Sequence, residues 1–359
     1  MVPLIAAAFA LAQAIVTVAI LDPRWTVAFS APPAAPAGFD AGTAYVPLKS
    51  GHLVAISLDR GTVRWQIEAA TNLQPATGDG LVFITVENAI EGIDAATGDV
   101  RWHTALPGGA ASPLYWDTGW LIASTPAGDL AAFRASDGSL MWRQAVGAAL
   151  AAPPAPALDR LYFALADGRL ISSLLSTGEV LWTRTITGRV SGLLALDDQL
   201  VFGTTGNEVQ SVDLLRGRER WKWRVGGDVA GLPIADDRRI YFTSRDNLLR
   251  AVDRKSGNLK WKASLPSRPS SGPLRIADLV VVPSVSTELL AFDATTGKAA
   301  ATIKAAGEIG TQPFLRIGSR STAPRLITVS RDGLLQGFGL RFEAPSAQLD
   351  VLPGERAVP

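Results

Sequence analysis

The chain has 359 residues and a formal net charge of +1, so its bulk charge predicts neither nucleic-acid binding nor binding to a membrane surface. Hydrophobic residues make up 47% of the chain and charged residues 19%, a composition that supports a large core and excludes global disorder. The chain has no cysteine, which excludes disulfides, thiolate metal sites and cysteine nucleophiles.

The N-terminal segment carries no charge from Pro3 to Leu21. An apolar stretch is followed by Ala12-Gln13-Ala14, which fits the A-x-A cleavage site of a secretory signal peptide. We therefore expect residues 1–14 to be a signal peptide, with a retained membrane anchor as the alternative. Either one predicts export to the periplasm or cell envelope. Ile15 to Trp25 reads as a strand that would survive the cleavage.

Tryptophan then recurs every 37 to 40 residues. The recurring residues are Trp25, Trp65, Trp102, Trp142, Trp182, Trp221 and Trp261, and a similar unit ends at Ala301. A glycine stands four residues before each of these positions except the first. A fixed period of about 40 residues is typical of repeat architectures.

Each unit contains the same sequence of elements. An apolar run such as Tyr162-Phe163-Ala164 predicts a buried strand, and an alternating segment such as Leu248 to Val252 predicts a second one. A D-x-x-T/S-G turn follows, as in Asp94 to Gly98, and a further strand ends on the tryptophan. A strand with a small-x-Pro element precedes the block. Four strands per unit are typical of a propeller blade.

Leu326 to Leu340 is an eighth unit that lacks its closing strand, whereas Ile15 to Trp25 is a closing strand without a unit. Joining the two hides both edges. The sequence therefore predicts an all-β fold: an eight-bladed β-propeller of four-stranded antiparallel blades over residues 15–342, closed by the N-terminal strand. Residues 343–359 are rich in proline and are expected to form a disordered tail.

The motif A-x-D-x-x-T-G-x-x-x-W, carried most fully by Ile93 to Trp102 and Val252 to Trp261, resembles the tryptophan-docking motif of the pyrroloquinoline quinone (PQQ) repeat family. Asp167 to Trp182 and Gly310 to Phe338 resemble blades of the BamB-type members, propeller lipoproteins of the outer-membrane β-barrel assembly machine. This resemblance implies a non-enzymatic envelope scaffold that binds protein partners, and it gives the seven tryptophans a structural docking role.

Two positions depart from the BamB-type pattern. Ala14 stands where those proteins carry a lipobox cysteine, and Gly147 to Leu150, which matches their partner loop, has no arginine. Two other functions remain open. One is a PQQ-dependent dehydrogenase, and the other is the sensor or interaction domain of a different envelope system.

The carboxylates, amides and histidines of the sequence do not form the pattern that a catalytic site needs. A PQQ enzyme holds Ca²⁺ in a cluster of carboxylates and amides, and no such cluster stands outside the predicted turns. The recurring aspartates fall at the same place in each unit and are expected in turns: Asp40, Asp79, Asp117, Asp159, Asp198, Asp237 and Asp278. His52 and His103 are isolated. We therefore expect no cofactor, no metal and no catalytic residue.

Charge is the one property that does not repeat. Residues 216–262 hold thirteen Lys and Arg against six Asp and Glu. Five of these cations alternate in the sequence and are predicted to share one face of one strand: Arg216, Arg218, Arg220, Lys222 and Arg224. One interpretation is a solvated edge. The sharper hypothesis is a patch that docks an acidic protein or a lipid headgroup, on a protein expected to be monomeric and not to bind nucleic acid.

Overall fold

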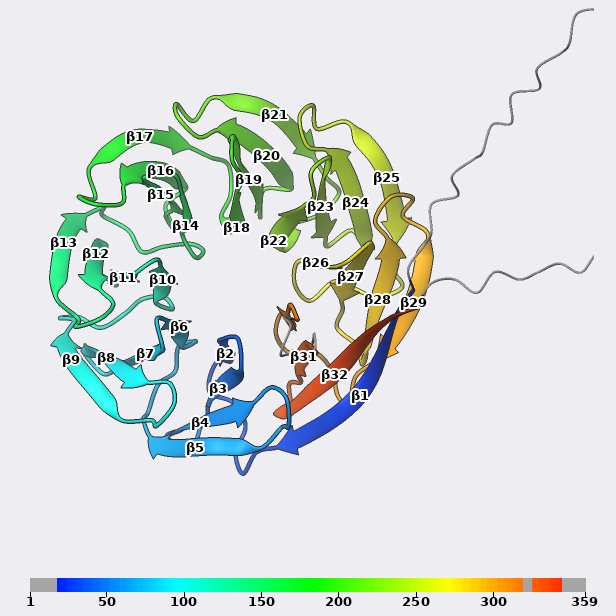
Figure 1. Ribbon diagram of the computed structural model, residues 1–359. Helices are drawn as coiled ribbons and strands as arrows, with labels where there is room; N and C mark the ends of the chain where they lie inside the picture. The colour runs from blue at the N-terminus through cyan, green and yellow to red at the C-terminus, as the bar shows by residue number, and fades with distance from the viewer. Residues whose placement is uncertain (1–17, 319–324, 344–359) are drawn as a thin grey trace, which may run out of the picture.

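The computed structural model describes residues 18–318 and 325–343. Within these ranges every regular element is a β-strand, and no helix is long and apolar enough to cross a membrane. Eight four-stranded antiparallel sheets stand in a ring, with the first strand of each blade toward its centre (Figure 1). The predicted eight-bladed β-propeller is therefore confirmed. The predicted signal peptide or anchor and the predicted tail beyond residue 343 lie outside the described residues.

The blades follow one another along the chain. Blade 1 consists of β2 (Gly38–Phe39), β3 (Thr43–Pro47), β4 (His52–Ser57) and β5 (Val63–Glu68). Blade 2 consists of β6 (Ala76–Gly78), β7 (Leu81–Val86), β8 (Ala89–Asp94) and β9 (Val100–Ala105). Blade 3 consists of β10 (Tyr115–Asp117), β11 (Trp120–Ser124), β12 (Asp129–Arg134) and β13 (Leu140–Ala145). Blade 4 consists of β14 (Ala155–Ala157), β15 (Arg160–Ala164), β16 (Arg169–Leu174) and β17 (Val180–Thr185).

Blades 5 to 8 repeat this order. Blade 5 consists of β18 (Val190–Ala195), β19 (Gln199–Thr204), β20 (Glu208–Asp213) and β21 (Glu219–Arg224). Blade 6 consists of β22 (Val229–Ala235), β23 (Arg239–Ser244), β24 (Leu248–Asp253) and β25 (Leu259–Ser264). Blade 7 consists of β26 (Leu274–Ile276), β27 (Leu279–Pro283), β28 (Glu288–Asp293) and β29 (Ala299–Lys304). Blade 8 takes β30 (Phe314–Arg316), β31 (Arg325–Val329) and β32 (Leu334–Glu343) from the C-terminal part of the chain.

The N-terminal strand closes the ring, as predicted. Strand β1 (Val18–Ala28) pairs antiparallel with β32, so that the last sheet has the order β1-β32-β31-β30. The pairing runs from Val18 opposite Glu343 to Ala28 opposite Leu334, with a bulge between Pro23 and Trp25. The strand thus continues three residues beyond the predicted end at Trp25, because those residues still find partners on β32.

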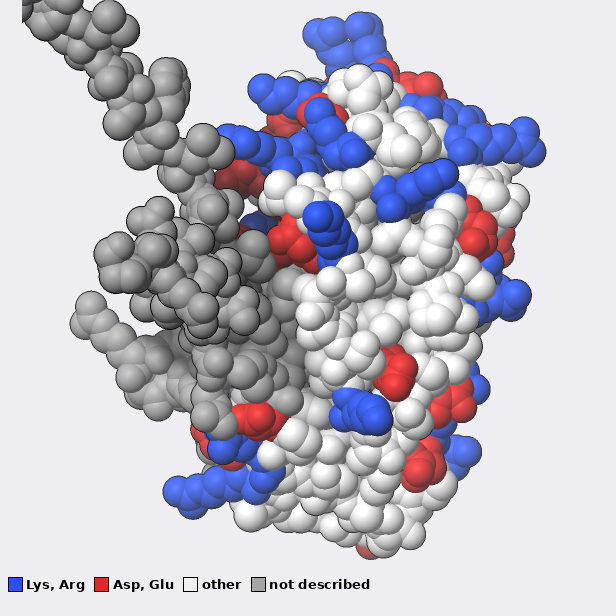
Figure 2. All heavy atoms as spheres, turned by 90° about the vertical axis from the view of Figure 1, so that its right-hand side faces the viewer, with Lys and Arg blue, Asp and Glu red and all other residues white. Residues whose placement is uncertain are grey.

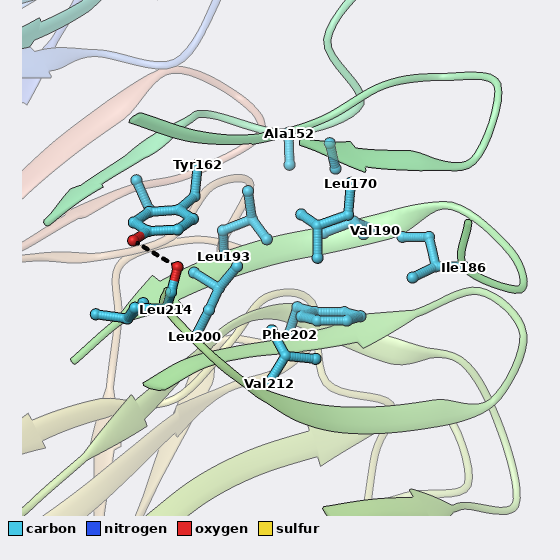
Figure 3. Close-up of a cluster of buried hydrophobic side chains, with 12 residues drawn as sticks. Ala152, Tyr162, Leu170, Ile186, Val190, Leu193, Leu200, Phe202, Val212 and Leu214 are labelled. Carbon is cyan, nitrogen blue, oxygen red and sulfur yellow. Dashed lines mark hydrogen bonds between the residues drawn. The ribbon is translucent and has the colours of Figure 1, made fainter. Parts of the chain in front are cut away.

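The core lies between neighbouring blades. The second and third strands of a blade are almost wholly buried because each sheet packs against a sheet on either side, as in β15 and β16. Figure 3 shows one such layer between blades 4 and 5, where Tyr162 and Leu170 meet Phe202 and Val212. Burial on both faces explains why these strands read as apolar runs rather than as alternating segments.

Each of the seven recurring tryptophans reaches from the outermost strand of its blade to the next blade. Trp182 Nε1 donates a hydrogen bond to the carbonyl oxygen of Leu214 at 3.1 Å, and Trp261 Nε1 donates to the carbonyl oxygen of Ala294 at 3.0 Å. The other five make the same bond: Trp25, Trp65, Trp102, Trp142 and Trp221. The acceptor lies in the turn between the third and fourth strands of the following blade, three residues before the turn glycine.

The glycine of that turn leaves room for the indole ring. Gly217 has a φ of +66°, and a Cβ added there would stand 2.9 Å from the Trp182 ring; Gly297, with a φ of +72°, stands in the same relation to Trp261. Ala301 occupies the tryptophan position of blade 7. Its neighbour, blade 8, has no such turn because its outermost strand comes from the N-terminus. The missing tryptophan therefore coincides with the missing turn.

In blades 1, 4 and 6 a buried tyrosine shares the acceptor of the tryptophan. Tyr241 Oη donates to the Ala294 carbonyl oxygen at 3.1 Å and to Asp236 Oδ2 at 2.6 Å, while its ring lies 5.8 Å from that of Trp261. Burial, and then the hydrogen bond to Asp236, raises the pKa of Tyr241 to about 12. The phenol therefore stays protonated and links the inner hairpin of blade 6 to blade 7.

Candidate interaction surface

The antiparallel order of the strands gives the ring two different faces. One face, here called the turn face, carries the D-x-x-T/S-G turns and the hairpins between the first and second strands, such as residues 158–159. The opposite face, here called the linker face, carries the connections between blades and the hairpins between the second and third strands, such as residues 205–207. An exposed charged residue near the end of a strand therefore lies on either the turn face or the linker face.

The five cations predicted to share one strand face are divided between the two faces. Strand β21 begins at Glu219, so Arg216 and Arg218 lie in the turn before it, where their backbone N–H groups donate to the Asp213 carboxylate. Arg220, Lys222 and Arg224 do alternate along β21, and all five side chains are exposed. The prediction of a single strand face is therefore wrong, because the turn glycine ends the alternation.

Two of the five are already neutralised. Arg220 Nη1 lies 2.5 Å from Asp198 Oδ2, and Lys222 Nζ lies 2.7 Å from Glu208 Oε1. Partial burial tends to raise the pKa of Asp198, but hydrogen bonds from Arg220 and Arg254 outweigh it and hold the pKa below its usual range. Asp198 is thus charged at neutral pH and cancels a cation.

The turn face of blades 5 and 6 is nearly balanced in charge. Its eight cations are Arg216, Arg218, Arg220, Arg238, Arg239, Arg254, Lys255 and Lys260, and its seven carboxylates are Asp197, Asp198, Asp213, Glu219, Asp236, Asp237 and Asp253. Because the positive and negative charges of this face nearly cancel, it offers little long-range attraction to an acidic partner.

The linker face of the same blades holds the basic excess. Its seven cations are Arg189, Lys222, Arg224, Arg245, Arg250, Lys262 and Arg268, and its three carboxylates are Glu208, Asp228 and Asp246. Glu208 pairs with Lys222, and Asp246 pairs with Arg250 at 2.5 Å. The five remaining cations are exposed and form no ion pair within the described part of the chain. Figure 2 shows Lys and Arg gathered in the upper part of the molecule, where β21 and β25 lie in Figure 1.

Four of these five cations were not singled out from the sequence: Arg189, Arg245, Lys262 and Arg268. Arg189 and Arg268 each stand seven residues after a tryptophan, in the connection between blades, and Arg245 lies in the hairpin turn opposite such a connection. Backbone hydrogen bonds join each connection to the next hairpin, as from Arg245 N to the Asp228 carbonyl oxygen. Counting positions from each tryptophan would have grouped Arg189 with Arg268, whereas counting along one strand could not.

The recurring aspartates lie at the hairpin turns between first and second strands. Asp40 illustrates their contacts, because its Oδ1 accepts hydrogen bonds from the backbone N–H groups of Gly42 and Thr43. His52 contacts Ser50, and His103 lies 3.4 Å from Glu91 on an exposed strand. In residues 18–318 and 325–343 no three His, Asp or Glu side chains gather in a way that could hold a metal ion.

The central channel contains a hollow of about 540 Å³ between the innermost strands of blades 3 to 6. Three prolines, Pro153, Pro154 and Pro156, line it beside Tyr115, and Asp117 is the carboxylate among its lining residues. Burial, and then the charge of Asp117, raises the pKa of Tyr115 to about 12. A PQQ site with Ca²⁺ requires six to eight oxygen ligands around the metal, and this lining does not fit that group.

Comparison with known proteins places the repeats in a family. The family model described as outer membrane protein assembly factor BamB matches residues 17–114, 50–192, 86–222 and 174–333. A protein of that name from Nitrosomonas eutropha is 26% identical over 191 residues, which covers 48% of this chain and 45% of the relative. The chain spans about half the length of the curated relatives it matches.

Solved structures share the fold at lower identity. The crystal structure of BamB from Moraxella catarrhalis aligns with a TM-score of 0.74 at 17% identity, covering 89% of this chain and all of that one. A quinohemoprotein alcohol dehydrogenase from Pseudomonas putida aligns with a TM-score of 0.68 at 13% identity, covering 94% of this chain and 78% of that one. At these identities the structures support the propeller alone. The overlapping sequence matches from residue 17 to residue 333 go further: the chain belongs to the family described as outer membrane protein assembly factor BamB.

Proposed function

We propose that the protein is a non-enzymatic scaffold of the cell envelope that takes part in outer-membrane protein assembly. The observation that carries this proposal is the family model, which matches residues 17–333 in overlapping segments. The family membership also agrees with the periplasmic or envelope location expected from the N-terminal segment. A scaffold needs a docking surface rather than a reaction centre, and the charge distribution of the ring supplies a candidate.

The proposed docking surface is the linker face of blades 5 and 6, and its partner is an acidic protein surface. Arg189, Arg245 and Arg268 stand at successive blade junctions. Arg224 is the last residue of β21, and Lys262 lies two residues before the end of β25. Asp228 is the one carboxylate of this face that is not used in an ion pair within the described residues. Unpaired cations gathered on one surface accelerate the encounter with an acidic partner and help to fix its orientation.

Reversing the three junction cations tests this surface. The triple variant Arg189→Glu, Arg245→Glu and Arg268→Glu should bind the outer-membrane assembly machine of the same organism at least about tenfold more slowly, because long-range attraction becomes repulsion. Its melting temperature should change little, since exposed charges contribute little to folding. Surface plasmon resonance with the purified machine measures the association rate, and added salt should slow the wild type in the same direction.

The matched control reverses three exposed cations of the turn face, Arg218→Glu, Arg238→Glu and Lys255→Glu. This variant has the same change in net charge but leaves the linker face intact, so its association rate should stay within about threefold of the wild type. Equal loss in both triple variants would show that net charge alone acts and would overturn the assignment of the surface. Failure of the wild type to bind would count against the scaffold function itself.

The dehydrogenase alternative has its own measurement. Titration of the purified protein with PQQ in the presence of Ca²⁺ should leave the quinone absorption spectrum unchanged, because the channel hollow lacks a cluster of oxygen ligands. A saturable spectral change that is lost in an Asp117→Ala variant would instead favour a quinoprotein. For the sensor alternative, a pull-down that recovers another envelope system without the assembly machine would be the deciding result.

A further inference from the structure

Two large apolar side chains, those of Leu158 and Leu215, are exposed in neighbouring turns of the turn face. Leu158 is 70% exposed and lies in the two-residue hairpin turn between β14 and β15. The corresponding residues of blades 2, 3 and 7 are Asp79, Thr118 and Ala277. In blade 8 the first residue after β30 is Ile317, which is 83% exposed as well.

The backbone makes Leu158 more unusual still. Its φ is +59°, in the left-handed region that L-residues with bulky side chains rarely adopt. The equivalent residues Asp79, Thr118 and Ala277 also have a positive φ, so the left-handed turn recurs, but among these four hairpins only blade 4 places a large apolar side chain there. A strained backbone that carries an exposed apolar side chain is a reason to look for a function outside the fold.

Leu215 is the second residue of this kind. It is 60% exposed at the tip of the Asp213 to Gly217 turn of blade 5. The corresponding tip residues of the other blades are Asp59, Ala96, Ser136, Ser176, Lys255 and Thr295. A large apolar residue occurs here in blade 5 alone, beside the blade that carries Leu158.

The two leucines stand on one continuous surface. Arg160, two residues after Leu158, reaches across the blade junction, and its Nη1 donates a hydrogen bond to the Leu215 carbonyl oxygen at 3.0 Å. Tyr162 and Trp182 hold the neighbouring Leu214 carbonyl oxygen. The turn of blade 5 is thereby fixed over the inner hairpin of blade 4, and both leucine side chains remain in solvent. We call the surface formed by Leu158, Asp159, Leu215 and Arg216 the leucine surface.

The charges that border the leucine surface differ between its two halves. Asp159 follows Leu158, and its side chain is 75% exposed with only a 3.7 Å contact to Arg160. Arg216 follows Leu215, is exposed, and forms no ion pair within the described residues. Asp159, Glu179 and Glu219 all stand on this side of the ring, which disfavours an anionic lipid surface as the ligand.

The acidic half and the basic half of the leucine surface complement each other. A two-fold axis between the leucines would bring Leu158 of one copy against Leu215 of the other and Asp159 against Arg216, twice per dimer. An interface made of the same patch on both subunits requires this self-complementarity. We propose that the protein forms a homodimer through the leucine surface, with a second copy of the chain as the occupant. The dimer replaces the expected monomer, uses the turn face, and does not rest on the proposed function.

Sedimentation equilibrium of the wild-type chain tests the proposal directly. Dimers should form at concentrations up to about 100 μM, since a specific interface of modest size has a Kd in the micromolar range or below. Asp159→Arg alone and Arg216→Asp alone should each weaken dimerisation at least about tenfold, because each places like charges across the interface. The double variant Asp159→Arg and Arg216→Asp should restore it, because the exchanged charges meet again in the two-fold arrangement.

Leu158→Gly separates the interface from the fold. Glycine accepts the positive φ, so the variant should melt at or above the wild-type temperature, while its dimerisation should weaken at least about tenfold. A wild type that stays monomeric at about 100 μM would overturn the proposal. So would a double charge variant that dimerises no better than the single variants, or dimers that survive both Leu158→Gly and Leu215→Ser unchanged. Melting curves of every variant show whether each remains folded.

Discussion

Deleting residues 15–28 should open the ring and destabilise all eight blades, not only the last one. The deletion removes β1, so β32 loses its antiparallel partner from Leu334 to Glu343. It also removes Trp25, whose ring packs against Gly61 and whose Nε1 bonds the Leu58 carbonyl oxygen of blade 1. Blades 8 and 1 are therefore no longer joined at their outer edge. In a ring whose repeats contact only their neighbours, one open junction removes stability from the whole.

The expected result is a protein that melts at a clearly lower temperature and associates through the exposed β32 edge, because an unpaired edge strand is a template for pairing with other chains. Thermal unfolding followed by circular dichroism and light scattering measures both effects. A truncated protein that melts like the wild type and stays in its assembly state would contradict the role of β1.

A circular permutant supplies the matched control. Val18 lies opposite Glu343 in the register of β1 and β32, so a hairpin loop of about two to four residues can join the two ends. A chain that begins after Ala28 and carries residues 18–28 behind Glu343 keeps every blade contact in a different order. It should regain the wild-type melting temperature, which would show that the strand itself acts and not the length of the chain.

The repeat made the fold predictable. Period, turn motif and tryptophan recur in the linear order of the chain, and one further observation, the incomplete unit at Leu326 to Leu340, sufficed to predict how the ring closes. These features are local: each blade is built from residues within about 40 positions of one another, so spacing along the chain reports spacing in the structure.

The candidate surface could not be predicted in the same way, because a face of the ring collects residues from several blades. Arg216 and Arg224 are eight positions apart and lie near opposite faces, whereas Arg189 and Arg268 are 79 positions apart and occupy equivalent junctions. The excess of thirteen cations over six carboxylates was a correct count. Which of those charges cancel depends on ion pairs such as Arg220 with Asp198, and these are visible only in three dimensions.

Leu158 is a second residue whose place on a surface could not be predicted from the sequence. In the sequence it is one more apolar residue near the end of a strand. Only the positive φ and the hydrogen bond from Arg160 to the next blade show that this leucine is both strained and placed beside a second exposed leucine. Sequence patterns describe what a residue contributes to its own strand, and interaction surfaces depend on neighbours from other blades.

Truncating a docking tryptophan should be nearly as damaging as opening the ring. Trp182→Ala and Trp261→Ala should each lower the free energy of unfolding by about 3–5 kcal/mol, as truncation of a large aromatic side chain in a packed interface does. Each change leaves a cavity above the glycine of the next blade and removes a hydrogen bond to its turn, at Leu214 for the first and at Ala294 for the second. Urea unfolding with unchanged m-values measures the loss.

Trp261→Phe separates the two contributions. A phenyl ring still covers Gly297 but cannot donate to the Ala294 carbonyl oxygen, which keeps the hydrogen bond from Tyr241. The loss should therefore be about 1–2 kcal/mol, the usual contribution of one hydrogen bond together with imperfect packing. The two substitutions at Trp261 thus predict a graded free energy of unfolding, with Trp261→Phe between the wild type and Trp261→Ala. If Trp182→Ala or Trp261→Ala kept full stability and lost only partner binding, the indole would be part of a binding site, and its place between the blades would not explain why it recurs.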